Sequence, residues 1–129
     1  MPNMTGITKV SGAAPVQILF NVQNQMSVGI KLGKNFAGAV TENGRKIVKA
    51  GTPLTGDLTN RTVAFTAAGE NNAKGVLLHD VDVTEQDANA TLLIWGFVNL
   101  NRVDAATKAL LTTQVQTTLA GQVYFLADN

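Results

Sequence analysis

The sequence predicts one small, mainly β domain with a short helical segment near its C-terminal end. Residues 75–98 contain two apolar runs rich in β-branched residues, joined by an acidic polar loop, and this pattern is typical of two buried strands. A chain of 129 residues is long enough to bury one hydrophobic core. The chain contains no cysteine, so disulfides and Cys-based zinc sites are excluded and stability must come from packing or subunit association.

The N-terminal part divides into an arm and a strand-containing extension. Residues 1–16 are rich in Gly, Ala, Ser, Thr, Asn and Pro, so we expect a flexible arm that orders on a partner. Residues 17–44 form the extension, in which apolar residues alternate from Ile18 to Leu32 and predict a strand or hairpin. A loop follows, and its Asn43-Gly44 pair predicts a tight turn because both residues tolerate positive φ.

Residues 45–129 are expected to form the β-rich domain. Short strands are predicted over residues 46–50 and 62–66, and a longer one over residues 75–83. In the longer strand the single histidine, His79, shares a face with Leu77, Val81 and Val83, which indicates a packed, hydrogen-bonded side chain.

The last third of the chain predicts a doubly covered strand, a helix and a closing strand. Residues 90–98 are apolar on both faces, with core or interface candidates Leu93, Trp95 and Phe97 on one of them, so the strand needs cover from two sides. Asp104 is a plausible N-cap for a helix over residues 105–119, and Thr112 marks a place where this helix can break. Gly121 ends it, and residues 122–128 form an edge or closing strand.

Composition and charge exclude several classes of protein. The N-terminus lacks the basic and long apolar regions of a secretory signal, and no apolar run approaches membrane-spanning length, so we expect a soluble protein with no membrane partner. Up to Ala50 six basic residues face one acid, whereas from Gly51 onward four face eight. This asymmetry either steers the basic part to an acidic partner or a neighbouring copy, or is ordinary solvated charge.

The sequence predicts no catalytic, cofactor or metal site. Residues 29–34 lack the spacing of a phosphate-binding loop, and residues 80–85 lack the glycine of a calcium loop, although weak cation binding by Asp80, Asp82 and Asp87 stays open. The basic cluster over residues 45–49 has no neighbouring aromatic side chain, so no nucleic acid partner is expected. We likewise expect that the protein is not an enzyme and has no small-molecule substrate.

Three segments in order resemble one protein family. They are KAGTPL at residues 49–54, GVLLHDVDV at residues 75–83 and LIWGFVN at residues 93–99. This chain resembles the head decoration proteins of tailed bacteriophages, the lambda-type capsid-stabilising family, over roughly residues 47–126.

The resemblance implies a small β-barrel or β-tulip-like domain with one or two short helices. It implies a homotrimer at three-fold sites on the outside of the virion, assembled in the host cytoplasm, which binds the major capsid protein and stabilises the expanded head. The arm would add a strand to capsid protein, with contact residues Met4, Thr5, Ile7, Thr8 and Val10. Two alternatives stay open: a fibre or carbohydrate-binding adhesion module, and a small ligand-binding or catalytic barrel that uses His79 with Asp80 and Asp82.

Overall fold

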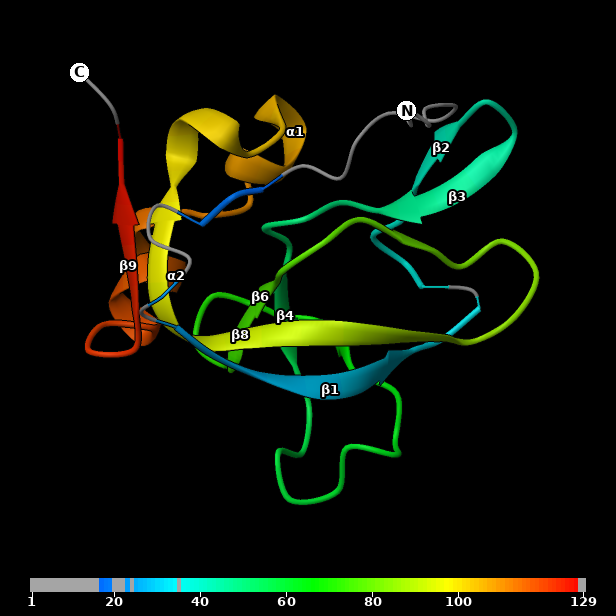
Figure 1. Cartoon of the computed structure of the whole chain (residues 1–129), viewed down its shortest axis with the longest axis horizontal. Coiled ribbons are helices and arrows are strands. Elements are labelled where there is room, and N and C mark those ends of the chain that lie inside the picture. The colour runs from blue at the N-terminus through cyan, green and yellow to red at the C-terminus, as the bar shows by residue number, and fades with distance from the viewer. Residues whose placement is uncertain (1–16, 20–22, 24, 35, 128–129) are drawn as a thin grey trace, which may run out of the picture.

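The longest element of the structure is strand β8, Ala88–Asn99, and the main sheet is built around it (Figure 1). The computed structural model describes residues 17–19, 23, 25–34 and 36–127. The main sheet has the order β1-β8-β6-β4-β5, formed by Met26–Leu32, Ala88–Asn99, Gly75–Leu77, Pro53–Thr55 and Thr66–Ala67. Strand β9, Val123–Leu126, adds to β8 in parallel, and all other pairs in this sheet are antiparallel. A second sheet has the order β2-β3-β7, formed by Val40–Glu42, Arg45–Val48 and Val81–Asp82.

The helical segments follow β8 and are short. They are η1, Leu100–Arg102, then α1, Ala105–Lys108, and α2, Thr113–Thr118. Asp104 caps α1 by accepting a hydrogen bond from the Thr107 N–H, as predicted. The helix breaks at Thr112, whose hydroxyl caps α2 by accepting from the Val115 N–H. Within the described part of the chain, no helix is long and apolar enough to cross a membrane.

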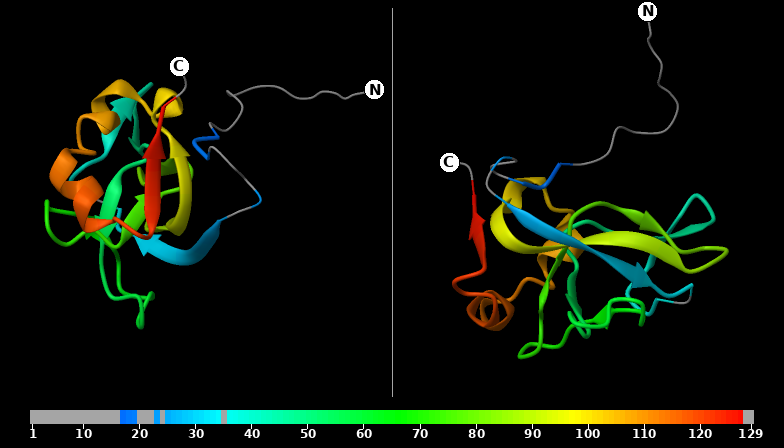
Figure 2. Two further views of the ribbon diagram at one scale, coloured as in Figure 1. Left: turned by 90° about the vertical axis from the view of Figure 1, so that its left-hand side faces the viewer. Right: turned by 60° about the horizontal axis from the view of Figure 1, so that its bottom comes forward.

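Two hydrophobic clusters form the core, and β8 contributes to both. Leu93 and Val98 belong to the cluster that α2 and β9 cover, whereas Leu92 belongs to the cluster beneath β1 and β4. Neighbouring residues of a strand point to opposite faces, so Leu92 faces one cluster and Leu93 faces the other. Both side chains are fully buried. Figure 2 shows β9 beside the end of β8, with the helical segments packed next to them.

A β-bulge lies in β8 opposite the start of β1. Met26 pairs with Trp95 and Ser27 pairs with Leu93, which leaves Ile94 as the extra residue. A bulge shifts the alternation of side chains by one position. Leu93, before the bulge, therefore faces the core, while Trp95, after it, is 40% exposed. The expectation that both faces of this strand are covered holds at Leu92 and Leu93 and is wrong at Trp95.

The turn predicted at Asn43-Gly44 and the helix end predicted at Gly121 are confirmed. Strands β2 and β3 form a hairpin whose two turn residues, Asn43 and Gly44, have φ values of 52° and 76°. Gly51, in the turn before β4, has a φ of 97°, and Gly121, between α2 and β9, has a φ of 83°. These positive φ values explain why Gly or Asn stands at each of these positions.

Two strand predictions are wrong. The strand expected over residues 62–66 is a turn and bend, and only Thr66–Ala67 enter the sheet as β5. The strand expected over residues 75–83 is two strands, β6 and β7, which lie in different sheets. His79 lies in the break between them and is exposed, so the packed histidine predicted from the alternation is also wrong.

The mainly β fold class with short helices is confirmed, but the sheet is not closed into a barrel. Within the described residues, the two end strands β1 and β5 share no ladder. They approach each other only at an isolated parallel bridge between Leu32 and Phe65, where the Phe65 N–H donates to the Lys31 carbonyl at 2.8 Å.

Gly75 is the tightest point between β6 and β8, and its substitution tests this packing. A Cβ at Gly75 would collide with the backbone carbonyl oxygen of Leu93, which has no flexible end to move away. We expect Gly75→Ala to lower the free energy of unfolding by about 1–3 kcal/mol, measured by urea denaturation. Gly29→Ala is the matched control, because a Cβ there meets nothing within 4 Å. Equal stability of the two variants would contradict this account of the sheet.

Candidate functional site

An exposed apolar surface lies on the outer face of the sheet where β8 meets β9. We call it the aromatic surface and define it by Met26, Trp95, Phe97, Tyr124 and Leu126. The rings of Trp95 and Phe97 meet edge to face with centroids 5.9 Å apart, and those of Phe97 and Tyr124 stack at 5.2 Å. Met26, Trp95, Tyr124 and Leu126 are each between 40% and 58% exposed. Large exposed apolar patches of this kind mark sites of protein association.

The bulge and the pairing of β9 together create this surface. After the bulge, Gly96 and Val98 face the core, so Trp95 and Phe97 face outward. Strand β9 pairs with β8 so that Tyr124 lies opposite Phe97, which places the ring of Tyr124 beside that of Phe97. Val123, which precedes Tyr124 in β9 and points to the opposite face, is buried in the core. The aromatic surface is therefore held by backbone pairing and not by a mobile loop.

The predicted site residues have three different environments. Leu93 is fully buried in the core, Trp95 is exposed and Phe97 is half-buried within the aromatic surface. The capsid-contact residues expected in the arm, Met4, Thr5, Ile7, Thr8 and Val10, lie outside the described residues.

Much of the basic cluster near residue 45 is paired within the molecule. Arg45 Nε lies 2.8 Å from the carboxylate of Asp82, and its Nη1 lies 3.5 Å from that of Glu85. Lys49 Nζ lies 3.1 Å from the carboxylate of Glu42 and 3.3 Å from that of Asp80. The charge asymmetry along the sequence is thus partly neutralised where β3 meets β7.

The acidic side chains considered for cation binding are each held by protein donors. The Asp80 carboxylate accepts from the Ala50 N–H at 2.7 Å, and the Asp87 carboxylate accepts from the Lys34 N–H at 2.9 Å. Asp82 accepts from both the hydroxyl and the N–H of Thr84. Among residues 17–19, 23, 25–34 and 36–127, no group of three or more His, Cys, Asp or Glu side chains is placed to hold a metal ion.

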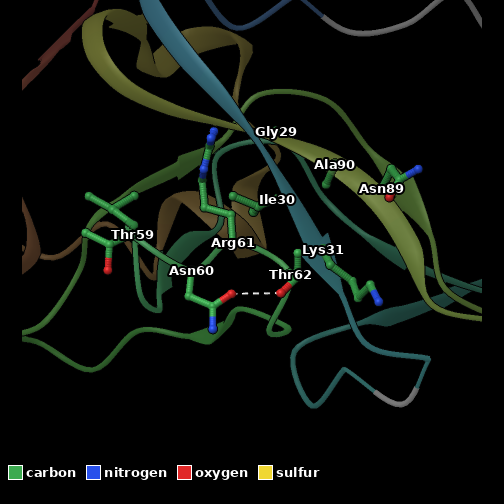
Figure 3. A pocket seen from close by; sticks show the side chains of 10 residues that line it. Gly29, Ile30, Lys31, Thr59, Asn60, Arg61, Thr62, Asn89 and Ala90 are labelled. Carbon is green, nitrogen blue, oxygen red and sulfur yellow. Dashed lines mark hydrogen bonds between the residues drawn. The ribbon is translucent and has the colours of Figure 1, made fainter.

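The structure also contains a groove that sequence reasoning missed. It has a volume of about 610 Å³ and lies between β1, the start of β8 and the loop of residues 57–62 (Figure 3). Its polar lining includes Lys31, Arg61 and Asn89. Three segments far apart in the sequence form it, so no local pattern could have indicated it.

Comparison with known proteins gives no match to a family model and no match to a curated protein.

The Asp82 interactions generate a pH prediction. The Thr84 hydroxyl, followed by the Arg45 guanidinium, lowers the pKa of Asp82 to about 2. An unfolded Asp has a pKa of about 3.9, so the ionised carboxylate stabilises the fold above about pH 4 and this contribution is lost as the pH falls toward 2. We expect Thr84→Val to raise the pKa of Asp82, measured by NMR titration of its carboxyl carbon.

The loss of stability of Thr84→Val relative to the wild type should be larger at pH 5 than near pH 2, because the unfolded and folded pKa values of Asp82 become more alike in the variant. Thr59→Val is the matched control, since Thr59 makes the same pair of hydrogen bonds to Asp57 at a separate turn. An Asp82 titration midpoint that is identical in the wild type and in Thr84→Val would refute the assignment of the hydroxyl as the main cause.

Proposed function

We propose that this chain is a non-catalytic structural protein of a phage virion, which binds the outside of the head as a trimer and stabilises the expanded capsid. The observation that carries the proposal is the aromatic surface on β8 and β9. Trp and Tyr are enriched among the few residues that dominate binding energy at protein interfaces. The resemblance of residues 47–126 to head decoration proteins supports the same assignment.

In this proposal the aromatic surface is the contact between copies of the chain. Its residues come from β1, β8 and β9, whose backbones are fixed by the sheet, so little ordering cost accompanies association. A homotrimer would bury Trp95 and Tyr124, which are 40% and 43% exposed in the single chain.

The N-terminal segment would provide the contact with the major capsid protein. The described chain begins beside the end of β8, where the Asn99 N–H donates to the Ile18 carbonyl at 2.8 Å and Leu19 bridges Val98. The first described residues therefore lie at the end of the sheet that carries the aromatic surface. A trimer joined there would present three such segments together, and docking of one raises the effective concentration of the others.

The direct test is decoration of phage heads. We expect the purified protein to bind expanded, undecorated heads of the phage that carries this gene, seen as added density at three-fold positions by electron microscopy. The decorated heads should withstand higher temperature or chelator concentration than bare heads. Absence of binding, or bound protein that leaves this resistance unchanged, would count decisively against the function.

The role of the aromatic surface is tested by substitution. We expect Trp95→Ala combined with Tyr124→Ala to raise the dissociation constant of self-association about tenfold or more, measured by analytical ultracentrifugation over a range of concentrations. Leu110→Ala is the matched control, because Leu110 is 48% exposed and lies outside the aromatic surface. Unchanged association of the double variant would show that copies meet elsewhere.

A further inference from the structure

Strand β1 is an end strand of the main sheet and has an incompletely paired edge. Thr91, opposite Gly29, directs its carbonyl to the Leu78 N–H on the other side of β8. In an antiparallel ladder this makes Gly29 a residue whose own N–H and C=O point away from β8. Lys31 is two residues further along β1, so its N–H and C=O also point away from β8. Its carbonyl accepts a hydrogen bond from the Phe65 N–H on that outer side. Among the described residues, the Gly29 N–H and C=O and the Lys31 N–H have no partner along this edge.

The groove lies directly along this edge. At one end, the bridge between Leu32 and Phe65 joins β1 to the neighbouring segment. Away from this bridge the loop of residues 57–62 diverges, and the space of about 610 Å³ opens beside Gly29. A Cβ at Gly29 would meet nothing within 4 Å, so the face of the sheet at this residue is open as well. The groove is thus the position at which one more strand would continue the sheet.

The opposite wall is held by hydrogen bonds within its loop. The Thr59 N–H and hydroxyl both donate to the Asp57 carboxylate, at 2.8 and 2.6 Å. The Thr62 hydroxyl donates to the Asn60 side-chain oxygen at 2.7 Å, as Figure 3 shows. A wall fixed in this way needs little rearrangement to receive an extended chain.

The charge of the groove selects the kind of chain. Lys31 and Arg61 line it, and no carboxylate does. In Figure 3 the guanidinium of Arg61 extends toward Gly29, while Lys31 projects near the far end of the groove. Neither side chain has an ion-pair partner among the described residues, in contrast to Arg45 and Lys49. Two copies of this edge would bring like charges together, so the charge disfavours self-pairing and favours an acidic partner.

We propose that this groove binds an extended acidic peptide segment of a partner protein, which adds a strand to the Gly29 edge of β1. The backbone of the segment would bond to the free N–H and C=O groups of Gly29. Its alternate side chains would place carboxylates beside Lys31 and Arg61, and apolar groups against Leu58, which is 38% exposed. The proposal does not depend on the proposed function, because the groove shares no residue with the aromatic surface.

The test uses the full chain and a capped peptide of about six residues in which valine alternates with glutamate, a length of about 20 Å when extended. At low ionic strength we expect NMR titration to show saturable binding, with the Gly29 and Lys31 amide protons shifting downfield and becoming protected from exchange. Arg61→Ala should weaken binding about fivefold. Arg102→Ala, which removes the same charge outside the groove, should leave the affinity unchanged.

Gly29→Pro tests the backbone contact separately. Proline removes the outward N–H and is tolerated on the free side of an edge strand, so binding should be lost while the urea unfolding midpoint stays close to that of the wild type. If this variant fails to fold, protection of the Gly29 amide in the wild-type complex decides the point.

Three results would overturn the proposal. One is equal binding of the peptide with lysine in place of glutamate. Another is an inorganic phosphate titration that shifts Arg61 and Lys31 as strongly as the peptide does while the Gly29 amide stays unprotected in both. The third is association of the chain with itself through β1 that excludes the peptide.

Discussion

The structure depends on the burial of β8 from both sides. Leu92 and Leu93 are adjacent and fully buried, because one faces the cluster beneath β1 and β4 and the other faces the cluster covered by α2 and β9. Truncation of a fully buried leucine lowers the free energy of unfolding by about 2–5 kcal/mol, so the packing of β8 against each cluster contributes strongly to stability. Every surface described above is defined relative to β8: the aromatic surface follows its bulge, and the groove lies beyond its partner β1.

The parts of the fold that the sequence predicted are those with local causes. The turn at Asn43-Gly44 needs positive φ, and Asp104 and Thr112 supply oxygens to helix N–H groups within three residues. The interruption between β6 and β7 has no such cause. The chain leaves the main sheet after Leu77 to pair with β3, while the apolar alternation continues through the break. The pattern therefore predicts one strand with His79 on its covered face, whereas His79 lies in the break between β6 and β7.

The candidate site shows the same limit. The alternation of residues 90–98 predicts Trp95 and Phe97 as core or interface candidates, but their exposure follows from the bulge at Ile94. The extra residue is itself apolar, so the apolar run does not reveal where the alternation shifts. The groove was beyond sequence reasoning for another reason: the parts that form it meet only when Phe65 bridges to Leu32 and turns the loop beside β1. Tertiary pairing, not local propensity, sets both surfaces.

The basic side chains fall into two groups, those paired with carboxylates of the same chain and those that line the groove without an ion pair among the described residues. Arg45 and Lys49 are paired with carboxylates across β2, β3 and β7. Ion pairs near a protein surface typically contribute about 0–1 kcal/mol each, so the main consequence of these pairs is to neutralise the charge of this region and not to stabilise the fold. Lys31 and Arg61 have no such ion pair among the described residues. Lys31 lies on the edge strand β1 and Arg61 lies in the loop that faces it. Charge along an edge strand is a usual protection against unwanted pairing. The protection is selective, because a cationic edge repels another copy of itself and still accepts a strand that carries the opposite charge.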